Sequence, residues 1–108
     1  MFKKPWYRIA LNVSLNELGI PTIRLNPAFR DEVIELAVVH TLTPHEGALL
    51  VYSRVSAQMN SLVRLSALET IRQWRVGPDV REEVYQRIFA EAHRGQNAFV
   101  TTNLPLRD

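Results

Sequence analysis

The stretch of this chain that most limits its fold is residues 44–76, which holds no proline after Pro44 and no glycine after Gly47. Leu, Ala, Arg and Gln, all residues that favour helices, are frequent in it. A single helix over the stretch would be roughly 50 Å long at ~1.5 Å per residue. A domain of 108 residues has a radius of gyration of only ~13 Å. The stretch therefore either breaks or extends beyond its own domain.

The apolar residues of this stretch change sides along its length. Those of the first half share one face of a helical wheel: Ala48, Tyr52, Val55, Met59 and Leu62. Those of the second half share another: Leu65, Leu68, Ile71 and Trp74. A break near residues 59–61, or at the capping-box pattern of residues 66–69, would turn both faces toward one core. Because both positions lie among strong helix formers, we expect a continuous helix whose second face is buried against a partner, most simply a second copy.

The N-terminal part of the chain has a different pattern, because residues 7–15 alternate strictly between apolar and other side chains. This alternation predicts a strand with one buried face. Residues 16–19 supply a turn in which Gly19 can adopt a positive φ. Residues 20–25 predict a second strand at a sheet edge, because Pro21 cannot donate a hydrogen bond to a neighbouring strand. Together these segments predict an N-terminal β-hairpin.

Three helix starts share one device, a potential capping residue followed by proline: Asn26-Pro27, Thr43-Pro44 and Gly77-Pro78. Proline suits the first helical position because its missing N–H would have no intrahelical partner there. We expect helices over residues 27–41 and 78–94 and a closing strand over 98–102. The predicted fold is a single domain over residues 1–108 of the α+β class, predominantly helical. It has an N-terminal β-hairpin, three or four helices including a long central one, and a short C-terminal strand.

Thr43-Pro44-His45-Glu46 matches a capping box, in which the Thr43 hydroxyl accepts from the Glu46 N–H and the carboxylate accepts from the Thr43 N–H. A zinc-protease motif would need histidine three residues after the glutamate, where Leu49 stands. His40 lies on the apolar stripe of its expected helix, and His93 lies in a last helical turn where it would complement the helix dipole. We therefore expect no metal site.

The sequence also contains no motif that indicates catalysis. The chain has no cysteine, which excludes disulfides, thiol catalysis and cysteine-bound zinc. Its four glycines are too scattered for a phosphate-binding loop, and it has no nucleophile elbow. The paired carboxylates at 31–32 and 82–83 lie in expected first turns, where they complement the helix dipole. We expect a non-enzymatic protein without a cofactor.

Arginine accounts for eleven of the thirteen basic residues. This bias indicates either phosphate or carboxylate recognition or a GC-rich bacterial genome, and the net charge of only +2 does not itself favour nucleic acid. On one continuous central helix, four arginines would lie within an arc of roughly 80°: Arg54, Arg64, Arg72 and Arg75. Leucine lies beside them, as in protein interfaces, where arginine surrounds an apolar centre.

We therefore expect a small cytoplasmic bacterial protein that dimerises or binds and regulates a larger protein, of a size that fits a phage- or plasmid-borne inhibitor. No apolar run approaches the ~18 residues of a membrane span. The expected contact residues are Arg64, Leu65, Leu68, Ile71, Arg72, Trp74 and Arg75. The alternative is a nucleic-acid-binding regulator that uses Arg54, Arg64, Arg72 and Arg75 on phosphates.

A helix-turn-helix motif would require a break in the central stretch near Asn60, with residues 62–75 as the recognition helix. The turn of that motif often contains glycine, and none lies between residues 48 and 76. Residues 42–46 are similar to the opening of the DNA-binding domain in some bacterial response regulators, but the similarity ends there. The sequence therefore identifies no family.

Overall fold

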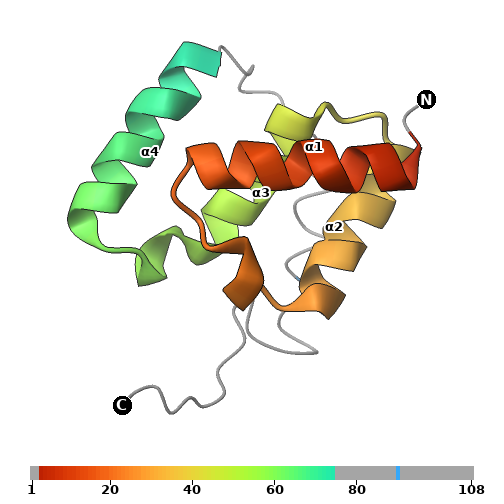
Figure 1. The fold of residues 1–108 in the computed structure, drawn as a ribbon, viewed down its shortest axis with the longest axis horizontal. Coiled ribbons are helices and arrows are strands. Elements are labelled where there is room, and N and C mark those ends of the chain that lie inside the picture. Colours follow the sequence, from red (N-terminus) through yellow and green to blue (C-terminus); the bar gives the residue numbers. More distant parts are fainter. Residues whose placement is uncertain (1–2, 75–89, 91–108) are drawn as a thin grey trace.

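The computed structural model describes residues 3–74 and Ala90. Within them lie four α-helices (Figure 1): α1 (Lys4–Glu17), α2 (Pro27–Val39), α3 (Pro44–Val55) and α4 (Ser61–Trp74). Two 3₁₀ turns connect them, η1 (Thr22–Arg24) before α2 and η2 (Ser56–Gln58) before α4. Because 82% of the described residues are helical and none lies in a strand, the predicted α+β class is wrong.

The predicted N-terminal β-hairpin is replaced by α1 and η1. Residues spaced four apart lie on the same side of a strand and also on the same side of a helix. Tyr7, Leu11 and Leu15 have this spacing and are fully buried. The helix leaves out the other two residues that a strand would have buried, since Ile9 is 65% and Val13 53% exposed. Packing on the core, which the alternation could not show, selected the helical period over the strand period.

The end of α1 is formed by the turn that the sequence predicted, although the turn closes a helix instead of joining two strands. Gly19 has a φ of +76°. Its N–H donates to the Asn16 carbonyl at 3.0 Å, and the Ile20 N–H donates to the Leu15 carbonyl at 3.0 Å. These two bonds are a Schellman motif, in which a left-handed residue after the helix satisfies its last carbonyls.

The predicted helix over residues 27–41 is confirmed as α2, and Asn26 caps it by accepting from the Ala28 N–H at 2.9 Å. A second Schellman motif ends α2, because the Leu42 N–H donates to the Ala37 carbonyl at 2.8 Å. The left-handed position of this motif is occupied by Thr41, with a φ of 55°. A β-branched residue is strained in that conformation.

The predicted capping box at the start of α3 is confirmed. The Glu46 N–H donates to Thr43 Oγ1 at 3.1 Å, and the Thr43 N–H donates to Glu46 Oε1 at 2.8 Å. Pro44 occupies the first turn of α3, as expected. The histidine-glutamate pair at this position is therefore part of the helix start.

The predicted long central helix is wrong, because it ends at Val55 and resumes at Ser61. Asn60 caps the second part, since its side chain accepts from the Leu62 N–H at 2.8 Å. The Arg64 guanidinium donates to the carbonyls of Ser56 and Met59, at 3.1 and 3.2 Å. The break is thus stabilised by side chains that satisfy the backbone groups it releases.

The hydrophobic core lies among α1, α2 and α3, and α3 passes behind α1 in Figure 1. Helices α1 and α3 approach closely at Gly47, where an added Cβ would lie 2.5 Å from the Tyr7 hydroxyl oxygen. Helix α4 lies beside this core and contributes one fully buried side chain, Ala67. The predicted helix over 78–94 and strand over 98–102 lie outside the described residues, apart from Ala90.

Candidate interaction surface

The outer side of α4 carries an apolar stripe that no other described helix covers. Leu62 is 76% exposed, Leu65 63% and Leu68 40%, and their spacing of three residues places them along one side of the helix. We call these three residues the α4 leucine stripe. The opposite side of α4 is also apolar, since Ala67 is buried and Ile71 and Trp74 pack against the core. Helix α4 therefore presents two apolar sides, and its own subunit uses only one.

Helix α4 is held against the core at both of its ends. Near its start, Val63 Cγ1 lies 2.8 Å from the position where Gly19 would carry a Cβ. At its end, the Trp74 ring stacks on the His45 ring at the start of α3, with centroids 4.0 Å apart and planes 5° from parallel. These contacts fix which side of α4 faces outward.

The structure separates the predicted contact residues into three groups. Leu65 and Leu68 are exposed on the outer side, as an interface requires. Ile71 and Trp74 pack inward against the core, and Arg64 bonds to the α3–α4 connection. Arg72 is exposed beside the stripe and pairs with Glu69 at 2.5 Å.

The arginines of the nucleic-acid alternative do not share one helical face, because the α3–α4 break separates Arg54 from Arg64 and Arg72. Arg54 lies on α3, where its Nε atom is buried and has no hydrogen-bond partner. Arg75 lies outside the described residues. The roughly 80° arc that a straight helix would have produced therefore does not form.

A second apolar surface lies on α1, and sequence reasoning missed it. Trp6 is 51%, Ile9 65% and Val13 53% exposed. With the start of α3 they line an open groove of ≈ 470 Å³, which we call the α1 groove; among the described residues, its lining is Trp6, Ile9, Ala10, Val13, Ser14, Glu17, Thr43, Pro44 and His45. The spacing of Trp6, Ile9 and Val13, at i, i+3 and i+7, is a helical signal that could have revealed it.

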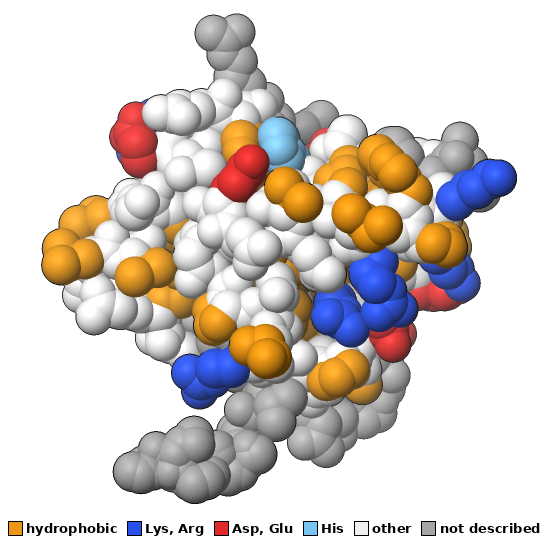
Figure 2. Space-filling model, in the orientation of Figure 1, with side chains coloured by type: hydrophobic (Ala, Val, Ile, Leu, Met, Phe, Trp, Pro, Cys, Tyr) orange, Lys and Arg blue, Asp and Glu red, His pale blue; other side chains and the backbone are white. Residues whose placement is uncertain are grey.

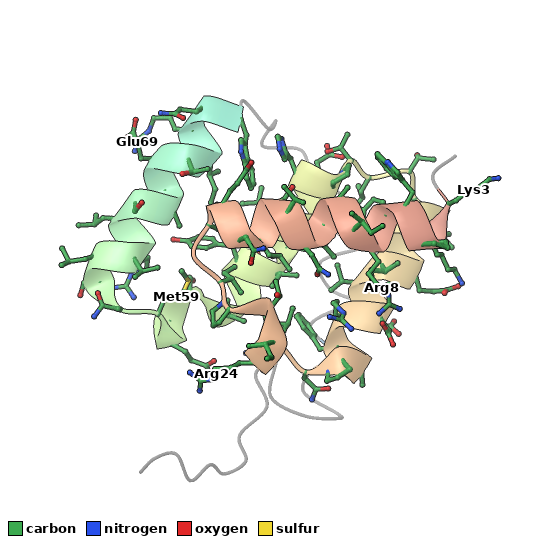
Figure 3. The ribbon with its side chains drawn as sticks, in the orientation of Figure 1. Lys3, Arg8, Arg24, Met59 and Glu69 are labelled. Atoms are coloured by element: carbon green, nitrogen blue, oxygen red, sulfur yellow. The ribbon has the colours of Figure 1, made fainter. Side chains whose placement is uncertain are left out.

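The two apolar surfaces can be seen from the same side of the molecule. Figure 2 shows one group of hydrophobic side chains over α1 and another at the outer edge of α4, with other side chains and backbone between them. The charged groups on the α2 side of α1 are paired, Lys4 with Glu35 at 2.6 Å and Arg8 with Asp31 at 3.3 Å. Figure 3 shows Arg8 between α1 and α2 and Glu69 on the far side of α4.

Among the described residues, the Tyr7 hydroxyl has the most strongly shifted pKa, and its role is structural. Burial, and then the nearby charge of Glu46, raise the pKa of the Tyr7 hydroxyl far above its ordinary value. That hydroxyl donates to the Thr43 carbonyl at 2.7 Å and so ties α1 to the start of α3. Because the Tyr7 hydroxyl stays protonated and hydrogen-bonded, it acts as a tether between the two helices.

Within residues 3–74 and Ala90, no group of three or more His, Cys, Asp or Glu residues could hold a metal ion. In the same part of the chain, no helix combines the length and the apolar character that crossing a membrane requires. No protein family, curated protein or solved structure matches the chain.

Proposed function

We propose that this chain is a non-enzymatic interaction module that binds a protein through the α4 leucine stripe. The observation that carries the proposal is the exposure of Leu62, Leu65 and Leu68 on a helix whose opposite side already packs against the core. Exposed apolar surface of this kind is stabilised by a partner that removes it from water. The lack of cysteine suits a cytoplasmic bacterial regulator, because disulfides belong mainly to oxidising compartments.

The surroundings of the stripe also suit a protein partner. Arg72 is exposed next to Leu68, and arginine beside a small apolar centre is the composition that protein interfaces favour. The stripe is a regular helical surface, so it can dock into an apolar groove without first becoming ordered. Helix-in-groove recognition is therefore the binding mode that we propose.

Site-specific photo-crosslinking in the native host tests this proposal. A photoreactive amino acid at position 65 should give a crosslink to one defined protein, and the same residue at position 23 should give none. Ile23 is a matched control because it is an apolar residue, 91% exposed, in η1 and outside both apolar surfaces. Equal crosslinking from both positions, or none from position 65, would contradict the proposal.

Nucleic-acid binding is the second candidate, and the connection between α2 and α3 favours it. Residues 40–43 join the two helices through a short turn with a left-handed residue, Thr41, followed by the buried Leu42. Short turns of this kind join the helices of a helix-turn-helix motif. The start of α3, however, offers Glu46 and His45 where a recognition helix would offer lysine or arginine to phosphates.

The salt dependence of DNA binding tests this second candidate. Binding to duplex DNA should weaken steeply between low and moderate ionic strength, and replacing Arg72 by alanine should flatten the slope. The Glu69→Gln variant is the control, because it removes the carboxylate that pairs with Arg72 and keeps the arginine. The absence of binding at low salt would remove this candidate.

A further inference from the structure

We infer that the partner of the α4 leucine stripe is a second copy of this chain, whose α1 groove receives the stripe. The inference rests on the proposed function and names its partner. Each copy would place its α4 leucine stripe in the α1 groove of the other copy. Both apolar surfaces of both copies would then be covered by one interface. Four features of the structure lead to this arrangement: the placement of the two surfaces, the directions of their helices, their area and their charge.

The placement of the two surfaces permits a reciprocal pairing. Both can be seen from one face of the molecule, the α1 group in the middle and right of the view and the α4 group at its left edge (Figure 2). A two-fold axis in the plane of that face, midway between them, brings the stripe of each copy onto the groove of the other. Such an interface is closed, because neither a leucine stripe nor an α1 groove is left for a third copy.

The directions of the two helices agree with this pairing. In Figure 1, α1 runs from right to left and α4 runs from lower left to upper right. The two-fold reverses left and right, so the α4 of one copy runs leftward across the α1 of the other. The α4 of one copy keeps its upward run, so it crosses the α1 of the other copy obliquely, and both helices run leftward toward their C-terminal ends.

The area decides between this arrangement and a simpler one. The exposed fractions of the three leucines, and of Trp6, Ile9 and Val13, correspond to on the order of 300 Å² of apolar surface for each triplet. A stable interface buries about 800 Å² per partner. Pairing α4 with α4 uses one triplet per copy and covers less than half of that area. The reciprocal arrangement uses both triplets, on the order of 600 Å², and so covers most of that area.

The charges at the ends of the two surfaces are opposite. On α1, Glu17 follows Val13 by one turn, lines the groove, and has no ion pair within residues 3–74. On α4, Arg72 follows Leu68 by one turn and binds Glu69 through one of its nitrogens, which leaves other donors of the guanidinium available. Each charge lies toward the C-terminal end of its helix, so the reciprocal pairing places an arginine and a glutamate of opposite charge at the same side of the interface.

The chain contains no cysteine, so single introduced cysteines report the pairing without interference. The purified protein should have the molar mass of a dimer by light scattering. A mixture of the Ile9→Cys and Leu65→Cys variants should crosslink with a short bismaleimide much faster than either variant alone. The Ile23→Cys variant mixed with Leu65→Cys is the control and should crosslink slowly.

Substitutions supply an independent measurement. Leu65→Glu and Ile9→Glu should each weaken the dimer on the order of 100-fold, because each puts a carboxylate against apolar surface. Ile23→Glu should leave the dimer intact, and circular dichroism should show all three variants equally helical.

Two results would overturn the inference. One is a wild-type protein that stays monomeric at millimolar concentration; if position 65 then still photo-crosslinks to another protein in the host, the proposed function stands and only the partner is wrong. The other is a dimer that Leu65→Glu disrupts and Ile9→Glu does not, or rapid crosslinking of Leu65→Cys with itself. That result would show α4 paired with α4.

Discussion

Helices α1 and α4 have the same length, 14 residues, and both carry apolar side chains on two sides. Helix α1 buries Tyr7, Leu11 and Leu15 completely among α2 and α3, whereas α4 buries only Ala67. Burial, which dominates folding stability, is therefore concentrated in α1 to α3. Helix α4 is attached to that core and contributes surface more than stability.

The largest difference in stability is expected between substitutions on the two sides of α1. Leu11→Ala should lower the free energy of unfolding by about 3 kcal/mol, because it leaves a cavity in a filled core. Ile9→Ala should change it by less than about 0.5 kcal/mol, because Ile9 is 65% exposed. Denaturant unfolding of both variants as monomers measures the difference. Equal losses would mean that Ile9 is buried, as the strand prediction required.

The contact between α1 and α3 provides the next largest effect. Gly47→Ala should destabilise the protein by about 2 kcal/mol, because the new methyl group overlaps the Tyr7 hydroxyl in a packed core. The double variant with Tyr7→Phe should lose less than the sum of the two single variants, since the overlapping oxygen is gone. Additive losses in this double-mutant cycle would show that the two residues do not touch.

The same contact makes core stability depend on alkaline pH. Because burial raises the pKa of Tyr7 in the folded state, its stabilising contribution is complete below the ordinary tyrosine pKa of about 10. Above that pH, the free energy of unfolding should fall by about 1.4 kcal/mol per pH unit, until the raised folded-state pKa is reached. Unfolding measured between about pH 8 and about pH 11 should show a shallower fall in the free energy of unfolding for Tyr7→Phe.

A smaller, stabilising effect is expected at the end of α2. Thr41→Gly should raise the free energy of unfolding by about 1 kcal/mol, because glycine adopts the left-handed conformation without strain. Thr41→Ala keeps a Cβ in the same conformation and serves as the control, with little gain expected. A destabilised Thr41→Gly variant would indicate that the threonine side chain has a role beyond its 2.6 Å bond to the His40 carbonyl.

The smallest effect is expected on α4. Leu62→Ser should change the stability of the monomer by less than about 0.5 kcal/mol, because Leu62 is 76% exposed. Hydrogen exchange should also show the amides of α4 opening more readily than those of α1, because α4 has few buried contacts. Equal protection of the two helices in the monomer would remove the distinction between core and attached helix.

The correct predictions concerned helix caps and turns, which form through bonds between residues close together in the sequence. The Thr43–Glu46 capping box, the prolines at positions 27 and 44 and the positive φ of Gly19 all follow from local hydrogen bonding and backbone sterics. Of the predicted contact residues, Leu65 and Leu68 are exposed, whereas Ile71 and Trp74 pack against the core, and their contact with a partner stays a prediction.

Tertiary packing decided what those local signals left open. The strand period and the helical period fit equally well at Tyr7, Leu11 and Leu15, and packing against α2 and α3 buries these three residues in the helical form. The break before α4 likewise depends on Arg64 reaching back to the carbonyls of Ser56 and Met59. Short-range bonds determine where a helix starts and stops, but which side of it turns inward depends on the apolar surface that the rest of the chain brings against it.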